Sequence, residues 1–307
     1  MRAVTLDSFD SPPGLRNDLP TPTAGGNGML VRVHASSVNP ADAAIAAGML
    51  RGMAEYEFPV TLGRDFAGVV EEVGSGVSRY KAGDDVYGFL IHANPTVHDG
   101  SWADYLVVPE DTSVARKPES VDFATAGAAP LAAITALAAL DALELSDSST
   151  VLVVGASGGV GSFFVQLAAT AGAHVIAPAL PEDLEYLSGL GAGEVLDRNA
   201  DVAAQIRERF PDGVDGLLDL VSSTPNASVL KPGGRLASAL GAAGEGSGRT
   251  NLIASPTTSN LERLAQLLEA GTLRVPFQGT YPLEQAGTAL EALPTTHTQG
   301  KLAITTA

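Results

Sequence analysis

The 307-residue sequence contains no cysteine, so it can form no disulfide, no thiolate-bound zinc site and no cysteine nucleophile. Basic residues are also scarce: 18 lysines and arginines stand against 35 aspartates and glutamates, which gives a net charge of −17. Nucleic acids and anionic membrane surfaces repel so acidic a chain, and we expect neither as a partner. A small anionic cofactor remains compatible, because local backbone dipoles can outweigh a distant net charge.

Apolar stretches of the membrane-spanning kind are missing too. Residues 123–140 carry no charge, but they are mostly alanine and too poor in large apolar side chains for a bilayer span, so they predict one buried helix. Residues 1–10 already include two aspartates and lack the basic start and apolar run of a signal peptide. We therefore expect a cytoplasmic protein of about two domains.

Two kinds of pattern divide the chain near residue 118. Before it, glycine turns separate short alternating segments, which predict strands at residues 29–34, 68–73, 85–90 and 102–108. After it, apolar runs alternate with helical segments. The predicted strands are residues 151–154, 174–177, 216–221, 235–240 (after a turn at 232–234) and 301–305, and the predicted helices are 162–171, 201–210 and 261–268. This alternation predicts an α/β domain with a doubly wound parallel sheet, from about residue 119 to 255.

The most specific motif is the glycine-rich turn between the strand at 151–154 and the helix that follows. It matches the dinucleotide fingerprint, with Ala156 in one glycine position. Gly158 would let the backbone approach a pyrophosphate, and Gly161 would let the helix pack closely. We therefore predict dinucleotide binding by Ala156, Ser157, Gly158, Gly159, Val160 and Gly161; the alternative is a turn that binds nothing.

The end of the next strand favours NADPH over NADH. NAD sites place an acidic residue there, whereas the strand at 174–177 runs out through Pro178 and Ala179, neither of which is acidic. Glu182 and Asp183 come a few residues later and can be explained as helix caps. Arg198 is a candidate ligand for the 2′-phosphate, or else a solvated surface charge.

Six further segments stand in a characteristic order. They are residues 36–42 (SSVNPAD), 59–68 (PVTLGRDFAG), 83–88 (GDDVYG), 100–105 (GSWADY), 130–136 (PLAAITA) and 297–302 (HTQGKL). Together they resemble the medium-chain dehydrogenase/reductase superfamily, specifically its zinc-free NADPH:quinone oxidoreductase branch. The resemblance implies a Rossmann domain (119–255), a β-rich GroES-like catalytic domain (1–118 plus 256–307), and a homodimer paired through edge strands near residues 235–240.

The residues at the zinc positions differ from those of zinc-dependent members. Such members carry a cysteine near residues 39–42 and a His-Glu pair after the glycine at Gly63, where this chain has Arg64 and Asp65. We expect no metal. His92, His98 and Asp99 could form a metal site in principle, but two loop histidines without a visible third ligand are more typical of a surface.

Without zinc to polarise a carbonyl, the resemblance implies hydride transfer from NADPH to a quinone or an α,β-unsaturated carbonyl, whose conjugation spreads the developing charge. One alternative is a 2-enoyl-thioester reductase, although no Lys/Arg cluster offers a groove for a CoA tail. Another is an NADPH-binding sensor or partner protein without turnover. The tyrosines that related reductases carry after the Asn-Pro segment are replaced here by Ala44 and Leu50.

The resemblance also implies cofactor contacts outside the glycine turn, from Asn39, Thr135, Val221, Ser222, Leu240, Gly241 and Lys301. The candidates for the proton donor are Asn39, Tyr56 and Arg64, with delivery by water as the alternative. Structural alternatives remain open. They are a turn for Asn39, a helix interior for Thr135, packing for Tyr56, an ion pair with Asp42 or Asp65 for Arg64, and core positions for Val221 and Leu240.

Overall fold

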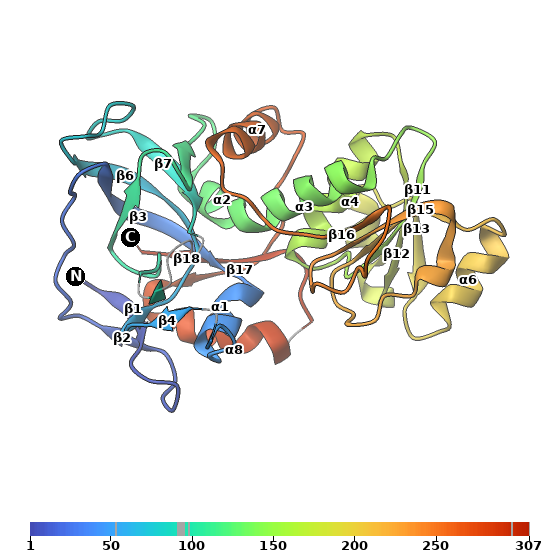
Figure 1. The fold of residues 1–307 in the computed structure, drawn as a ribbon, viewed down its shortest axis with the longest axis horizontal. Helices are drawn as coiled ribbons and strands as arrows, with labels where there is room; N and C mark the ends of the chain where they lie inside the picture. The colour runs from blue at the N-terminus through green and yellow to red at the C-terminus, as the bar shows by residue number, and fades with distance from the viewer. Residues whose placement is uncertain (53, 91–95, 98, 296, 307) are drawn as a thin grey trace.

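Figure 1 shows the computed structural model of the chain, which describes residues 1–52, 54–90, 96–97, 99–295 and 297–306. A β-rich part and a parallel sheet lie at opposite ends of an elongated molecule. Helices α2 (Phe123–Ala128), α3 (Pro130–Leu143) and α4 (Gly159–Thr170) lie between them.

The β-rich part is organised around one long sheet. Its strands, in spatial order, are β10 (Val114–Arg116), β7 (Asp85–Phe89), β6 (Asp65–Val73), β3 (Gly28–Val38), β18 (Lys301–Thr305) and β17 (Phe277–Pro282), with β9 (Tyr105–Pro109) also paired to β3. Smaller sheets join β2 (Gly14–Arg16), β1 (Ala3–Leu6) and β5 (Val60–Thr61), and β4 (Glu55–Tyr56) with β8 (Thr96–Val97). Helices α1 (Pro40–Ala46), α7 (Thr258–Glu269) and α8 (Ala286–Thr295) complete this half.

The second sheet is parallel throughout. Its spatial order is β13 (Glu194–Asp197), β12 (His174–Ala179), β11 (Thr150–Val154), β14 (Val214–Asp219), β15 (Leu230–Ser238) and β16 (Arg249–Asn251). Helices α5 (Leu184–Leu190) and α6 (Val202–Arg209) connect strands of this sheet. The strand order reverses beside β11, which is where a doubly wound sheet binds its ligand, so the predicted Rossmann fold is confirmed.

Three expectations about elements were wrong. Residues 123–140 form two helices, because Pro130 has no N–H to continue α2 and instead starts α3. The strand expected from residue 102 starts at Tyr105, and the Trp102 indole, which is fully buried, donates to the Ser37 carbonyl. The turn at 232–234 lies inside β15 as a bulge, since Val214 pairs with Leu230 and Gly216 already pairs with Arg235.

The two sheets share a hydrophobic core. One buried cluster runs from Tyr87 and Phe89 in the β-rich sheet, through α3, to Phe163 and Phe164 on α4. Alanines cover much of α3, so strands of both sheets approach its backbone closely. The shared burial holds the cleft between the sheets in a defined shape. None of the helices in the described part of the chain combines the length and apolar character that a membrane crossing requires.

Candidate functional site

The glycine turn has one packed side and one open side. A Cβ at Gly161 would lie 2.2 Å from the Gly155 carbonyl oxygen and 2.6 Å from the Ala156 Cα, so packing requires glycine there. A Cβ at Gly158 would meet nothing nearer than 3.6 Å. Gly158 caps α4, whose first amides have no acceptor within the helix. The open side therefore presents backbone donors and the positive end of the helix dipole.

A pocket of about 320 Å³ begins at this turn and extends over the carboxyl ends of β12 and β14. It brings together five residues predicted from the sequence, Ser157, Ala179, Arg198, Val221 and Ser222, and adds Thr224. The exposed Arg198 is placed there by its backbone N–H, which donates to the Ala179 carbonyl at 3.1 Å. Val221 is 61% exposed, so the core alternative for it was wrong.

A second pocket, of about 220 Å³, lies on the other side of the turn. One wall comes from Gly158, Gly159, Val160 and Gly161, and the facing walls come from residues 38–40, 298 and 300–302. Both pockets are lined by Gly155 and Val221, so they adjoin across the glycine turn. Together they form a long cleft between the two sheets with the turn at its middle.

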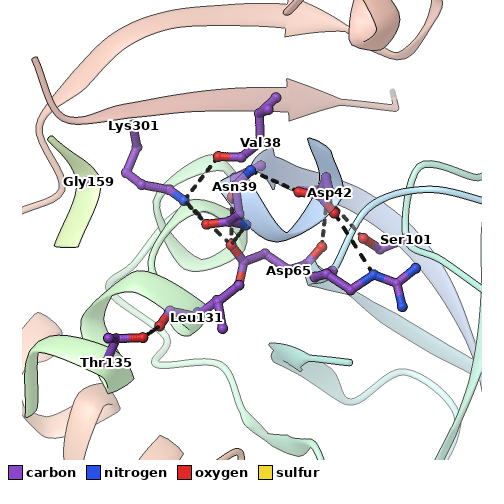
Figure 2. Close-up of polar contacts among 12 residues, drawn as sticks. Val38, Asn39, Asp42, Asp65, Ser101, Leu131, Thr135, Gly159 and Lys301 are labelled. Atoms are coloured by element: carbon purple, nitrogen blue, oxygen red, sulfur yellow. Dashed lines mark hydrogen bonds and ion pairs between the residues drawn. The ribbon is translucent and has the colours of Figure 1, made fainter. Parts of the chain in front are cut away.

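Lys301 and Asn39 meet in the wall of this second pocket (Figure 2). The Lys301 ammonium donates to Asn39 Oδ1 at 2.6 Å and lies 3.6 Å from Asp65 Oδ2. The Asn39 amide group in turn donates to Asp65 at 2.8 Å and to the Ser37 hydroxyl at 3.2 Å. Asn39 is thus more than a turn residue, because its side chain joins a buried polar network and has both amide hydrogens in use.

Asp65 is the residue of this network that the sequence reasoning left without a function. It is fully buried, and it accepts the Ser37 hydroxyl at 2.5 Å and the Leu131 backbone N–H at 2.7 Å, in addition to Asn39. Leu131 lies in the first turn of α3, so the carboxylate also faces a helix N-terminus, where the dipole stabilises it. The sequence signal that could have pointed to a function for Asp65 was its position in the family segment PVTLGRDFAG.

Asp42 and Arg64 form a second buried pair behind Asn39. Asp42 Oδ1 lies 3.9 Å from Arg64 Nε, and Asp42 Oδ2 accepts the Asn39 backbone N–H at 2.8 Å. Burial raises the pKa of Asp42 to about 7, against the opposing effect of Arg64. Arg64 also donates to the Asp99 carbonyl at 2.8 Å and lines neither pocket of the cleft. Of the two roles predicted for Arg64, a catalytic one and an ion pair, the structure therefore contains the ion pair, which is made with Asp42.

Other predicted site residues point elsewhere. The Tyr56 hydroxyl donates to the Ile45 carbonyl at 3.2 Å, and its ring packs against Phe9. The Thr135 hydroxyl bonds back to the Leu131 carbonyl at 2.7 Å within α3, as Figure 2 shows. Neither residue lines the two pockets of the cleft.

Leu240 and Gly241 follow β15 and also lie outside the lining of both pockets. Leu240 is 56% exposed, so the core alternative for it was wrong. His92 and His98 lie outside the described residues. Within the part of the chain that is described, no group of three or more potential metal ligands occurs.

Asp183 does more than cap a helix. It is fully buried, and besides the Leu180 backbone N–H it binds His297 Nε2 at 2.7 Å and the Gln299 amide at 2.8 Å. Although burial acts to raise the pKa of Asp183, these hydrogen bonds hold it below its ordinary value.

A second contact holds the same C-terminal segment. The Gly300 backbone N–H donates to the Ser157 carbonyl at 2.8 Å, directly after the residue that binds Asp183. Residues 297–301 are therefore fastened beside the glycine turn, which places Lys301 at the cleft.

Comparisons with known proteins agree with this arrangement. Residues 25–119 match the alcohol dehydrogenase GroES-like domain family and residues 190–304 the zinc-binding dehydrogenase family. The chloroplast envelope quinone oxidoreductase homolog of Arabidopsis thaliana is 32% identical over 99% of this chain and 98% of its own length. The NADPH-dependent alkenal/one oxidoreductase of the same plant is 32% identical over 94% of this chain and 75% of its own length.

A solved structure shows the same fold. The quinone oxidoreductase from Coxiella burnetii superposes with a TM-score of 0.89 at 30% sequence identity, over 100% of this chain and 99% of that one. With the six motif segments and the strand order of the parallel sheet, these likenesses show that the chain belongs to the medium-chain dehydrogenase/reductase superfamily, in its quinone oxidoreductase branch.

Proposed function

We propose that this chain is a zinc-independent, NADPH-dependent oxidoreductase that transfers hydride to a quinone or an α,β-unsaturated carbonyl compound. The observation that carries the proposal is the cleft of two adjoining pockets, with the open side of the glycine turn at its middle. A dinucleotide has this shape, with two nucleoside ends joined by a diphosphate. The names of the relatives, quinone oxidoreductase and alkenal/one oxidoreductase, support the substrate classes.

The residues of the cleft fit the cofactor. The amides at the start of α4 would hold the diphosphate, and the larger pocket would hold the adenosine end. There Arg198, with the hydroxyls of Ser222 and Thr224, offers donors for a 2′-phosphate, and Ala179 ends β12 without the carboxylate that would repel one. This combination supports NADPH over NADH.

The second pocket would hold the nicotinamide end, which when bound supplies the hydride. Val38, Pro40, Leu293 and Leu302 give this pocket apolar walls, which exclude water from the acceptor and favour direct transfer. Zinc independence is supported by the sequence, because the chain has no cysteine and the cation of Arg64 follows Gly63, where related zinc enzymes carry a ligand.

The test is a spectrophotometric assay of NADPH oxidation. Purified protein is mixed with NADPH and either 9,10-phenanthrenequinone or 3-buten-2-one, with and without EDTA. We expect oxidation with at least one acceptor and the same rate in EDTA. Thermal stabilisation by NADPH without turnover on a broad panel of both acceptor classes would instead support a sensor and contradict the proposal.

We also propose the remaining features predicted from the sequence: the domain division at 118/119 and 255/256, a cytoplasmic location and a homodimer. The dimer seam needs one change. Strand β15 contains most of residues 235–240, but it is interior, because β16 pairs on its outer side and forms the edge of the sheet. Ile253, just after β16, is 81% exposed, and Leu240 is 56% exposed. These apolar side chains support pairing along β16.

A further inference from the structure

Among the described residues that line the pocket for the nicotinamide end, Lys301 is the only one with an ionisable side chain. Its stem passes against the first turn of α4, where a Cβ on Gly159 would lie 3.1 Å from Lys301 Cδ. Its side chain is 2% exposed, so any exchange of its proton takes place inside this pocket or its wall. Figure 2 shows the ammonium between Gly159 and Asn39.

The surroundings of Lys301 allow it to exist without its extra proton. Asp65 keeps three other hydrogen-bond donors, from Ser37, Asn39 and Leu131. A neutral Lys301 therefore leaves no unpaired buried carboxylate behind, which would be strongly unfavourable. The Lys301 bond to the Val38 carbonyl is long, at 3.4 Å, so one N–H is only weakly engaged.

The charged groups around Lys301 act in opposite directions. Burial lowers its pKa below the ordinary lysine value of 10.5, whereas the carboxylates of Asp65 on β6 and Asp42 on α1 act to raise it. Arg64 lies beyond Asp42 and offsets part of that carboxylate's charge. The net effect makes Lys301 a stronger acid than a solvated lysine, which favours donation of its proton.

The other polar groups nearby are poorer donors. Both amide hydrogens of Asn39 are in use, and the hydroxyls of Tyr56 and Thr135 bond to backbone carbonyls outside the pocket. Thr298 lines the pocket, but an alcohol is a much weaker acid than an ammonium.

We propose that Lys301 is the catalytic acid of this reductase, an inference that rests on the proposed function above. The acceptor gains two electrons and one hydrogen as hydride from the reduced nicotinamide, and its carbonyl oxygen becomes an enolate or hydroquinone oxyanion. Lys301 then gives it a proton: an N–H bond breaks, its electron pair stays on Nζ, and an O–H bond forms. The neutral amine regains a proton from water once the product has left.

The first test compares Lys301→Arg, which keeps the positive charge but is too weak an acid to donate, with Lys231→Arg, an exposed lysine on β15 outside the cleft. We expect both variants to bind NADPH like the wild type in a fluorescence titration. We expect kcat to fall by about 100-fold or more in Lys301→Arg and to stay unchanged in Lys231→Arg. The wild-type loss of kcat at alkaline pH should disappear in Lys301→Arg.

The second test needs no turnover and no Lys301 variant. The chain has four lysines, at positions 81, 117, 231 and 301, so NMR of protein labelled with ¹³C-lysine gives four Cε signals, and single arginine variants at the first three assign that of Lys301. We expect it to titrate below 10.5. We expect the midpoint to rise when NADP⁺ and 4-nitrophenolate, an oxyanion like the reduced acceptor, are added together.

The possible failures are distinguishable. If the wild type reduces an acceptor and Lys301→Arg does so equally fast with the same alkaline limb, Lys301 is not the acid and the proposed function stands. An unchanged Lys301 midpoint on addition of the phenolate would likewise remove Lys301 from contact with the acceptor. A wild type that neither binds NADPH nor reduces any acceptor would overturn both proposals.

Discussion

At the scale of single residues, one end of the cleft is lined by Ala179 and the exposed Arg198, and the other has a buried polar wall around Asn39. Ala179 and Arg198 could be placed because each lies at or just after the end of a strand that is readable from the chain. The environment of Asn39 could not, since its partners Asp65 and Lys301 are 26 and 262 residues away in sequence. No pattern in the neighbouring sequence indicates that strands β3, β6 and β18 and helix α3 meet at this point.

Arg198 provides the most direct test of cofactor preference. Arg198→Ala should weaken NADPH binding by about 10- to 100-fold, the worth of a charge-assisted hydrogen bond to phosphate, and leave NADH binding nearly unchanged. Arg207→Ala, on the exposed face of α6 and outside the pocket lining, is the matched control. Titration calorimetry with both cofactors measures the difference. An equal loss for NADPH and NADH would remove Arg198 from the 2′-phosphate.

Asp42 should make the protein less stable as the pH rises. Its pKa is raised to about 7 from an unfolded value of 3.8, so between these values the folded state holds a proton that the unfolded chain has released. The free energy of unfolding therefore falls with rising pH across this window, by up to about 1.4 kcal/mol per pH unit. Asp42→Asn cannot ionise and should gain stability relative to the wild type between about pH 4 and pH 7. Urea unfolding at several pH values measures this, and a constant difference would contradict it.

At the scale of elements, the glycine turn was predictable because its pattern is local: a strand, a turn and a helix in immediate succession. The break between α2 and α3 was missed because the uncharged, alanine-rich run hides the effect of Pro130. The interior position of β15 was missed because the short edge strand β16, of three residues, leaves almost no pattern of its own.

Two glycines of the turn should respond oppositely to alanine. Gly161→Ala places a methyl group 2.2 Å from the Gly155 carbonyl and should destabilise the fold by about 3 kcal/mol or more. A methyl group at Gly158 makes only an ordinary contact, 3.6 Å from the Gly155 carbonyl oxygen, so Gly158→Ala should cost less than about 1 kcal/mol. It should nevertheless weaken NADPH binding at least about tenfold, because the methyl occupies the path of the diphosphate. Thermal unfolding and NADPH titration separate the two effects. Full NADPH affinity in Gly158→Ala would mean that the diphosphate does not approach there.

At the scale of the whole molecule, family motifs spread along the chain predicted both sheets. The sequence did not indicate how the two halves are joined. It depends on a core shared through α3, and on residues 297–301, which return to the β-rich sheet after binding Asp183 and Ser157 beside the parallel one. Both contacts join segments more than a hundred residues apart, and they complete the cleft.

If two chains pair along the edge strand β16 of the parallel sheet, a charge placed beside that edge should separate them. Light scattering should give twice the chain mass of 31.2 kDa, and Ile253→Glu should give the single mass, because it buries a charge in an apolar seam. Met49→Glu is the control, since Met49 is 68% exposed but lies after α1 in the β-rich part. A wild-type monomer, or a dimer unaffected by Ile253→Glu, would exclude this seam.

In the mechanism proposed here, the open side of the glycine turn binds the diphosphate of a reduced nicotinamide cofactor and so directs the reactive end of the cofactor into the pocket of Lys301. Titration calorimetry of the wild type with NADPH and with NADH tests it most directly. We expect saturable binding of one NADPH per chain, tighter than that of NADH. The absence of detectable binding for both cofactors would contradict it.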